Sequence, residues 1–217
     1  MFEIEQMSDA KEPMTVPTLL RAILSEIMTK SADLSERWVG LYFRIAYTFG
    51  VEAYRHQSDY LVDLILRKME DETFVRMRDL VAREQFDMLP TLQYTLSRMW
   101  VLSTYEVIRL AQETDVGRTH AKLKALRRRI EMVRVPLAKQ EIANDQRIKD
   151  SITLVRVGPG DPKPQSYSAR DPSPYYPPTL GETATGSTAW RVLDSKTGQT
   201  VDISRRALSD EMLALFS

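Results

Sequence analysis

Four side chains that could bind a divalent metal ion follow one another at helical spacing in the first third of the chain. They are Glu52, His56, Asp59 and Asp63. On a helix of about 100° per residue all four lie within about 40° of Glu52, so their carboxylate and imidazole groups would share one face. The opposite face would carry the apolar residues Val51, Tyr54, Leu61, Val62 and Ile65. The four are therefore either a candidate metal site, which needs a ligand from a second helix, or the solvent face of an amphipathic helix.

Glu106 lies within the apolar stripe of a helix predicted over residues 88–114. That stripe consists of Leu92, Leu96, Met99, Val107 and Leu110. Because burying an unpaired carboxylate costs several kcal/mol, Glu106 must be paired, protonated or functional. Its expected partner is Arg127 or Arg134, on a further helix predicted over 119–149. Glu106 and Arg134 are thus candidates for a structural ion pair or for a polar cleft with a catalytic role.

The helix predicted over 119–149 is strongly basic. From Arg118 to Lys139 the chain has eight basic residues and one acidic residue, Glu131. Such an excess can neutralise phosphates, which makes RNA a candidate partner. The candidate nucleic-acid-binding residues are Lys122, Lys124, Arg127, Arg128, Arg129 and Arg134. Alternatively, acidic stretches such as 70–72 lie nearby and cancel the field.

The run from Arg134 to Gln140, Arg-Val-Pro-Leu-Ala-Lys-Gln, resembles the motif of the HEPN superfamily. HEPN proteins are helical bundles, many of them dimeric ribonucleases of toxin and defence systems, marked by an arginine, a spacer of four to six residues and a histidine. The resemblance covers residues 88–145 and places Arg134 at the motif arginine. Gln140 fills the histidine position and cannot act as a general acid or base, so the resemblance implies an RNA-binding or degenerate, non-cleaving member.

Helical periodicity organises the chain from residue 16 to about residue 150. Thr15 and Pro17 fit the start of a helix over 16–30. The next helix, capped by Asp33 or Ser35, is expected to reach about Glu70 with a break near Gly50, and the acidic run 70–72 fits another helix start. The remaining expectations are helices over 73–85, 88–114 and 119–149, a stop at Val116-Gly117, and a kink or division at Pro136.

The last third of the chain predicts β-structure. Residues 152–157 read as a strand, residues 158–186 as a Pro/Gly-rich linker or extended arm, and residues 189–193 and 200–203 as a hairpin. A three-stranded mini-sheet is expected from these three strands. Ser204 to Phe216 form an amphipathic helix that either covers the hairpin or binds a partner. The candidate partner-binding residues are Tyr175, Tyr176, Leu208, Met212, Leu215 and Phe216.

The predicted fold class is mainly α: a helical bundle with a Pro/Gly-rich arm and a small C-terminal β-hairpin plus short helix. We divide the chain into a loose N-terminal arm, a helical bundle domain, a strand with the Pro/Gly-rich arm, and a hairpin with the C-terminal helix. The respective ranges are 1–15, 16–150, 151–187 and 188–217.

Composition narrows the function. The chain has 217 residues, no cysteine, and 30 basic against 30 acidic residues. Disulfides and thiolate chemistry are excluded, while a secretory leader, a membrane span and a cofactor are not indicated, which predicts a cytoplasmic protein. Glycine-rich phosphate loops, Gly-x-Ser-x-Gly and His-Glu-x-x-His are absent from the sequence. The leading hypothesis is a non-enzymatic protein-interaction or assembly module that binds a protein partner or itself, and the alternative is a HEPN-like RNA-directed protein.

Overall fold

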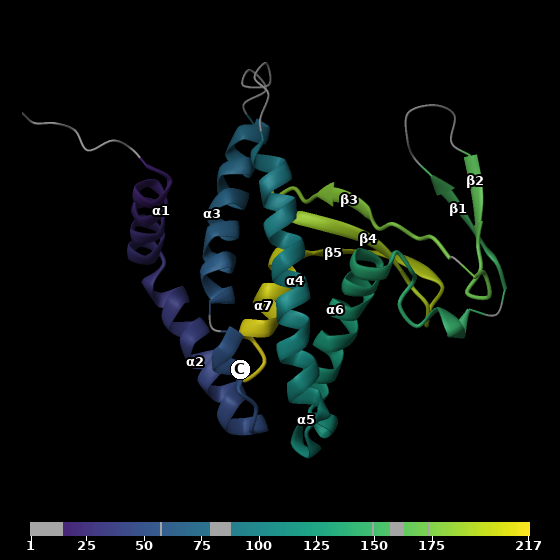
Figure 1. Cartoon of the computed structure of the whole chain (residues 1–217), viewed down its shortest axis with the longest axis horizontal. Helices are drawn as coiled ribbons and strands as arrows, with labels where there is room; N and C mark the ends of the chain where they lie inside the picture. Colours follow the sequence, from purple (N-terminus) through teal and green to yellow (C-terminus); the bar gives the residue numbers. More distant parts are fainter. Residues whose placement is uncertain (1–14, 57, 79–87, 149, 157–162, 173) are drawn as a thin grey trace, which may run out of the picture.

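A computed structural model describes residues 15–217 except 57, 79–87, 149, 157–162 and 173, so the expected N-terminal arm lies outside it apart from Thr15. The helices are α1 (Val16–Lys30), α2 (Ala32–Phe49), α3 (Asp59–Arg78), α4 (Leu89–Glu113), α5 (Asp115–Thr119), α6 (Ala121–Lys139) and α7 (Arg205–Leu213), with short 3-10 turns η1 (Ala53–His56) and η3 (Asp145–Arg147). The strands are β1 (Ile152–Arg156), β2 (Lys163–Tyr167), β3 (Thr179–Glu182), β4 (Thr188–Asp194) and β5 (Gln199–Ser204). The predicted fold class is confirmed: a mainly helical chain carries a small antiparallel sheet near its C-terminus, followed by a short helix (Figure 1).

Several helix ends lie where local chemistry predicts them. The Thr15 hydroxyl accepts a hydrogen bond from the backbone N–H of Thr18 and Pro17 occupies the first turn, so α1 matches the predicted helix over 16–30. Gly50 ends α2 in the left-handed conformation, with φ +66°, which confirms the predicted break. The second helix itself begins at Ala32, after Ser31, and not at a cap formed by Asp33 or Ser35.

Other predicted helix boundaries are wrong. The acidic run 70–72 lies inside α3 and not at the start of a helix. Glu70 is buried there and forms ion pairs. The helix α5 spans Val116-Gly117, where a helix stop was expected. Gly117 lies very close to the end of α4, since a Cβ on it would lie 1.9 Å from the carbonyl oxygen of Ala111. Helix α6 continues through Pro136 but ends at Lys139, ten residues early, because Gln140 adopts φ +60°.

The main core joins the helices to the C-terminal sheet and α7. The rings of Trp38 in α2 and Trp100 in α4 lie edge to face with centroids 6.4 Å apart. Trp190 of β4 and Leu208 of α7 are fully buried in the same cluster. Residues 188–217 therefore share the core of the helical bundle. Within the described residues, no helix has the length and apolar composition needed to cross a membrane.

The sheet differs from the predicted mini-sheet in its third strand. Strands β3, β4 and β5 form one antiparallel sheet in that order, in which Trp190 pairs with Leu180 on one side and with Ile203 on the other. The predicted strand over 152–157 does not join it; β1 pairs instead with β2. The described parts of the Pro/Gly-rich stretch thus supply two strands, β2 and β3. A second small cluster of Ile142, Tyr167, Tyr176 and Leu193 packs β2 and the segment that follows it against the main body.

Candidate functional site

The four candidate metal ligands are not brought together. Because α2 ends at Gly50 and Glu52 precedes the turn η1, no single helix carries all four residues. Glu52 is exposed, whereas Asp63 is 0% exposed, so the alternative of a common solvent face is also wrong for Asp63. In the part of the chain that the structure describes, no group of three or more His, Cys, Asp or Glu side chains could hold a metal ion.

Two of those four residues meet Ser103 of α4. The Ser103 hydroxyl donates to Oδ2 of Asp59 at 2.5 Å and lies 3.3 Å from Nδ1 of His56. Burial raises the pKa of the Asp59 carboxyl, while the hydrogen bond from Ser103 opposes that shift. A hydrolytic triad needs the imidazole between hydroxyl and carboxylate, using both ring nitrogens. Here the hydroxyl binds the carboxylate directly, and Nδ1 of His56 faces both the Ser103 hydroxyl at 3.3 Å and Oδ2 of Asp59 at 3.8 Å. We therefore interpret the three residues as a polar contact between η1, α3 and α4.

Glu106 and Arg134 do not meet. Glu106 is half-exposed and accepts a hydrogen bond from Nε of Arg109 at 2.8 Å, one helical turn along α4. The guanidinium of Arg134 lies over the ring of Tyr105, 4.8 Å from its centroid. The expected ion pair of Glu106 with Arg127 or Arg134 is therefore wrong.

The reason is that α4 buries a different face from the one predicted. Met99 and Leu110 of the predicted stripe are exposed. The buried face instead includes Gln93, Ser97 and Thr104, small or polar residues that an apolar pattern does not select. Two of them have tertiary partners: Gln93 donates to the carbonyl oxygen of Gly186 at 2.7 Å, and Ser97 donates to the hydroxyl of Thr188 at 3.2 Å.

The basic side chains of α6 point in several directions. Lys122 donates to the carbonyl oxygens of Ala214 and Ser217 at the end of the chain, and Arg129 pairs with Glu211 of α7. On another side of the helix, Arg128 pairs with both carboxylate oxygens of Asp194 at 2.7 Å, Arg127 donates to Gln112 at 3.0 Å, and Lys124 is exposed. Much of the predicted positive charge is thus used in contacts within the chain.

Three of the candidate partner-binding residues form part of the chain's own core. Leu208, Met212 and Leu215 are at most 2% exposed in the cluster that contains Trp38 and Trp100. The expectation that they bind a partner is wrong, because α7 packs onto the helices. Phe216 lies against the rings of Phe49 and His120, Tyr176 packs against Tyr167, and Tyr175 remains exposed.

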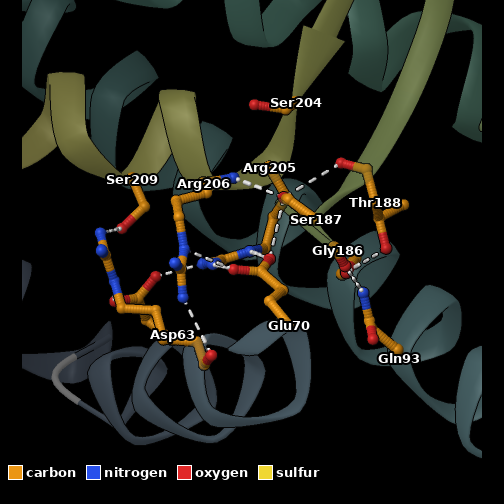
Figure 2. Close-up of polar contacts among 12 residues, drawn as sticks. Asp63, Glu70, Gln93, Gly186, Ser187, Thr188, Ser204, Arg205, Arg206 and Ser209 are labelled. Carbon is orange, nitrogen blue, oxygen red and sulfur yellow. Dashed lines mark hydrogen bonds and ion pairs between the residues drawn. The ribbon is translucent and has the colours of Figure 1, made fainter. Parts of the chain in front are cut away.

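A buried ion-pair network that the sequence analysis did not find joins α3 to α7 (Figure 2). Arg205, the first residue of α7, is fully buried, and its Nε and Nη2 donate to the two carboxylate oxygens of Glu70, each at 2.6 Å. Its Nη1 donates to Asp63. Its guanidinium also lies 5.5 Å from the ring centroid of Trp100. One cation thus contacts two carboxylates whose side chains are 0% exposed.

Two arginines and a serine complete this network. Arg67 Nε donates to Asp63 at 2.9 Å, and Arg206 Nε donates to Glu70 at 2.7 Å. The Ser187 hydroxyl donates to Glu70 at 2.9 Å and accepts from the backbone N–H of Arg206 at 3.1 Å. Both buried carboxylates have cationic and hydrogen-bonding partners within the chain. We therefore interpret the network as a structural contact that holds α7 against α3, and not as a ligand site. The spacing Asp63-Arg67-Glu70, at i, i+4 and i+7, is the one sequence signal for a charged helix face here.

The network makes stability depend on pH. Burial raises the pKa of the Asp63 carboxyl, but the charges of Arg205 and Arg67 outweigh it and hold this pKa below its ordinary value. A carboxyl whose pKa is lowered by folding stabilises the protein above its unfolded pKa, about 3.9, and loses that contribution as the pH falls through the folded value. We expect the difference in unfolding free energy between wild type and Asp63→Asn, from urea titrations, to be constant above about pH 5 and to shrink as the pH falls below about 4. Asp115→Asn, on a side chain that is 98% exposed, serves as the control; a gap for Asp63→Asn that stays constant into acid would contradict the assignment.

Helix α1 has an apolar face that is covered only at its C-terminal end. Ile27 is the one buried residue of this 15-residue helix. On the same face, Val16, Leu19, Leu20 and Ile23 are 70%, 43%, 52% and 43% exposed. In Figure 1 α1 lies at the left side of the molecule, away from α4 and α6. We call Val16, Leu19, Leu20 and Ile23 the open α1 face; contiguous exposed apolar side chains of this kind mark interaction surfaces.

A comparison of the chain with known protein families, with curated proteins and with solved structures finds no match.

Proposed function

We propose that this protein is a non-enzymatic assembly module that associates with a second copy of itself through the open α1 face. The observation that carries the proposal is the exposure of four large apolar side chains on a helix whose last turn alone is packed. An amphipathic helix is normally stabilised by burying its apolar stripe, so a stripe left in water favours association.

The spacing of the open α1 face fits a helix as the partner. Val16, Leu20 and Ile23 follow one another at intervals of four and three residues, the spacing of a coiled-coil seam. Ile27 continues this spacing but is already buried within the chain. An identical helix has the same spacing and can supply the matching seam in an isologous pair. Equal numbers of acidic and basic residues also mean that two copies lack the net-charge repulsion that keeps many proteins monomeric.

The positions of the candidate catalytic residues support the non-enzymatic part of the proposal. Glu106 pairs with Arg109 and Arg134 covers Tyr105, so neither forms a cleft with the other. The HEPN-like alternative depends on Arg134 and on a basic helix open to RNA, and therefore has less support, because Arg128, Arg129 and Lys122 already bind acceptors within the chain.

Replacing Leu20 and Ile23 together with glutamate is expected to convert a dimer to a monomer. Two carboxylates in each α1 would have to lose their water in the pair, so we expect the dissociation constant to rise by about 100-fold or more. Sedimentation velocity of the full chain over a range of concentrations measures this. Met99→Glu is the matched control, since Met99 is 59% exposed on α4, outside the open α1 face. The proposal would be contradicted if the wild-type chain stayed monomeric at high concentration. It would also be contradicted if Met99→Glu weakened association as much as the double glutamate replacement.

A second measurement locates the interface directly. Because the chain has no cysteine, Ile23→Cys introduces its one thiol. In a parallel pair, where each residue of the seam faces its own counterpart, the two thiols lie close together and oxidation yields a covalent dimer. Tyr47→Cys, at a side chain that is 92% exposed on α2, is expected to yield none.

A further inference from the structure

A cavity of about 540 Å³ lies between α6, the segment that follows it, and the turn from β4 to β5. In Figure 1 this is where the right-hand end of the β4–β5 hairpin comes next to the chain after α6. The side chains at its edge include five basic residues, Lys124, Arg127, Arg128, Arg147 and Lys196. Two acidic residues, Glu131 and Asp194, line it as well. The basic residues come from three separate segments, and the fold brings their charges to one concave site.

One acidic residue of the cavity is already neutralised and fixes its geometry. Asp194 accepts two hydrogen bonds from Arg128 at 2.7 Å and a third, at 2.9 Å, from the backbone N–H of Lys196. These contacts tie the β4–β5 turn to α6, and the turn closes at Gly198 with φ +69°. In the described part of the chain, no carboxylate lies within ion-pair distance of Lys124, Arg147 or Lys196. Their charges are therefore available to a ligand, and Glu131 is the acidic lining residue that opposes them.

Arg127 lines the cavity with a guanidinium that the chain satisfies only in part. Its Nη1 donates to Gln112 at 3.0 Å, but its Nε is buried and, in the described part of the chain, has no hydrogen-bond partner. Arg127 is half-buried and lines the cavity, so its guanidinium can meet a ligand there, and guanidinium groups bind phosphate oxygens in a defined, often bidentate geometry.

We propose that this cavity binds a small organic molecule that carries a chain of phosphate groups. The volume is within the range of about 300–1,000 Å³ found for small-molecule sites. Met132 and Ala143 add apolar surface to the lining, which suits an organic part attached to the phosphates. The site lies on residues outside the open α1 face, so it goes beyond the proposed assembly function.

The arrangement of α6 favours a compact anion over a nucleic-acid strand. A nucleic-acid strand is bound by basic side chains that follow one another along a groove. Here Lys122 and Arg129 bind the end of the chain and α7, and Arg134 covers Tyr105. Of the other basic residues of α6, Lys124, Arg127 and Arg128 line the cavity, and Lys139 lies outside it.

Titration calorimetry of the full chain with inorganic tripolyphosphate and with ATP, at low ionic strength and without divalent metal ions, tests the proposal. Both probes are expected to bind with one site per chain. Arg127→Gln and Lys196→Gln are each expected to weaken binding about tenfold or more, since each removes a charged contact. Lys196 lies in an exposed turn, so its replacement does not endanger the fold. Lys139→Gln, on the same helix but outside the cavity, should leave affinity within about twofold.

Three results would overturn the proposal. The first is the absence of binding by either probe, and the second is binding that neither Arg127→Gln nor Lys196→Gln changes. The third comes from a fluorescent single-stranded RNA of twelve nucleotides. If it binds more tightly than tripolyphosphate, with a steep salt dependence and with losses for Lys139→Gln and Arg127→Gln alike, the basic surface is a nucleic-acid site.

Discussion

Replacing Arg205 with methionine is expected to lower the free energy of unfolding by about 3–5 kcal/mol, because it leaves buried charges without their partner. Arg205 donates two hydrogen bonds of 2.6 Å to Glu70 and one to Asp63, and all three side chains are 0% exposed. Arg67 and Arg206 each keep one carboxylate paired but cannot replace the bidentate contact. The unbranched methionine can keep the contact of this side chain with the ring of Trp100.

Urea unfolding followed by circular dichroism measures this effect. The matched control is Arg191→Met, which removes an arginine with a similar two-bond contact to Asp202 at 2.9 Å but with both side chains at least 58% exposed. Exposed pairs contribute about 0–1 kcal/mol. Adding Glu70→Gln to Arg205→Met should cost less than Glu70→Gln costs alone, since the second change then removes a charge that has already lost its bidentate partner. Equal losses for the two arginine changes would mean that α7 is held by its apolar contacts and not by the network.

Local features of the sequence were sufficient to predict most of the helices and the hairpin. The start of α1 depends on Thr15 and Pro17, and the end of α2 depends on Gly50, so each is fixed by residues within one turn of it. The β4–β5 hairpin likewise follows from two short runs, 189–193 and 200–203, on either side of a turn-rich segment. These predictions hold because the chemistry that sets them is local.

The predictions of candidate sites were wrong where the burial of a side chain depends on residues far away in the sequence. Asp63 is buried because Arg205, 142 positions later, pairs with it, and no periodicity of α3 reveals that partner. The face of α4 was misassigned because Gln93 and Ser97 are buried against residues 186–188, polar positions that an apolar pattern assigns to solvent. The turn η1 separates Glu52 from α3, which begins only at Asp59, and this removes the common helical face on which the metal hypothesis depended.

Replacing Gly186 with alanine is expected to destabilise the fold by about 2–5 kcal/mol, because two penalties coincide at this residue. Its φ of +74° lies in the left-handed region, which costs an alanine about 1–2 kcal/mol. In addition, the new Cβ would lie 2.2 Å from the carbonyl oxygen of Glu70 and 2.8 Å from the backbone nitrogen of Phe74. Both are backbone atoms of α3, so the turn between β3 and β4 must move away from the helix. That movement pulls on Ser187, whose hydroxyl binds Glu70 at 2.9 Å.

Gly198 allows the two penalties to be separated. It has nearly the same backbone conformation, with φ +69°, but an added Cβ there meets no atom within 4 Å. Gly198→Ala should therefore cost only the conformational part, about 1–2 kcal/mol, and the excess loss in Gly186→Ala measures the close approach of the β3–β4 turn to α3. Thermal and urea unfolding of the two variants provide both values. If they were equal, the turn would have room to shift, and the contact between Gly186 and α3 could not be what places Ser187 on the buried ion-pair network.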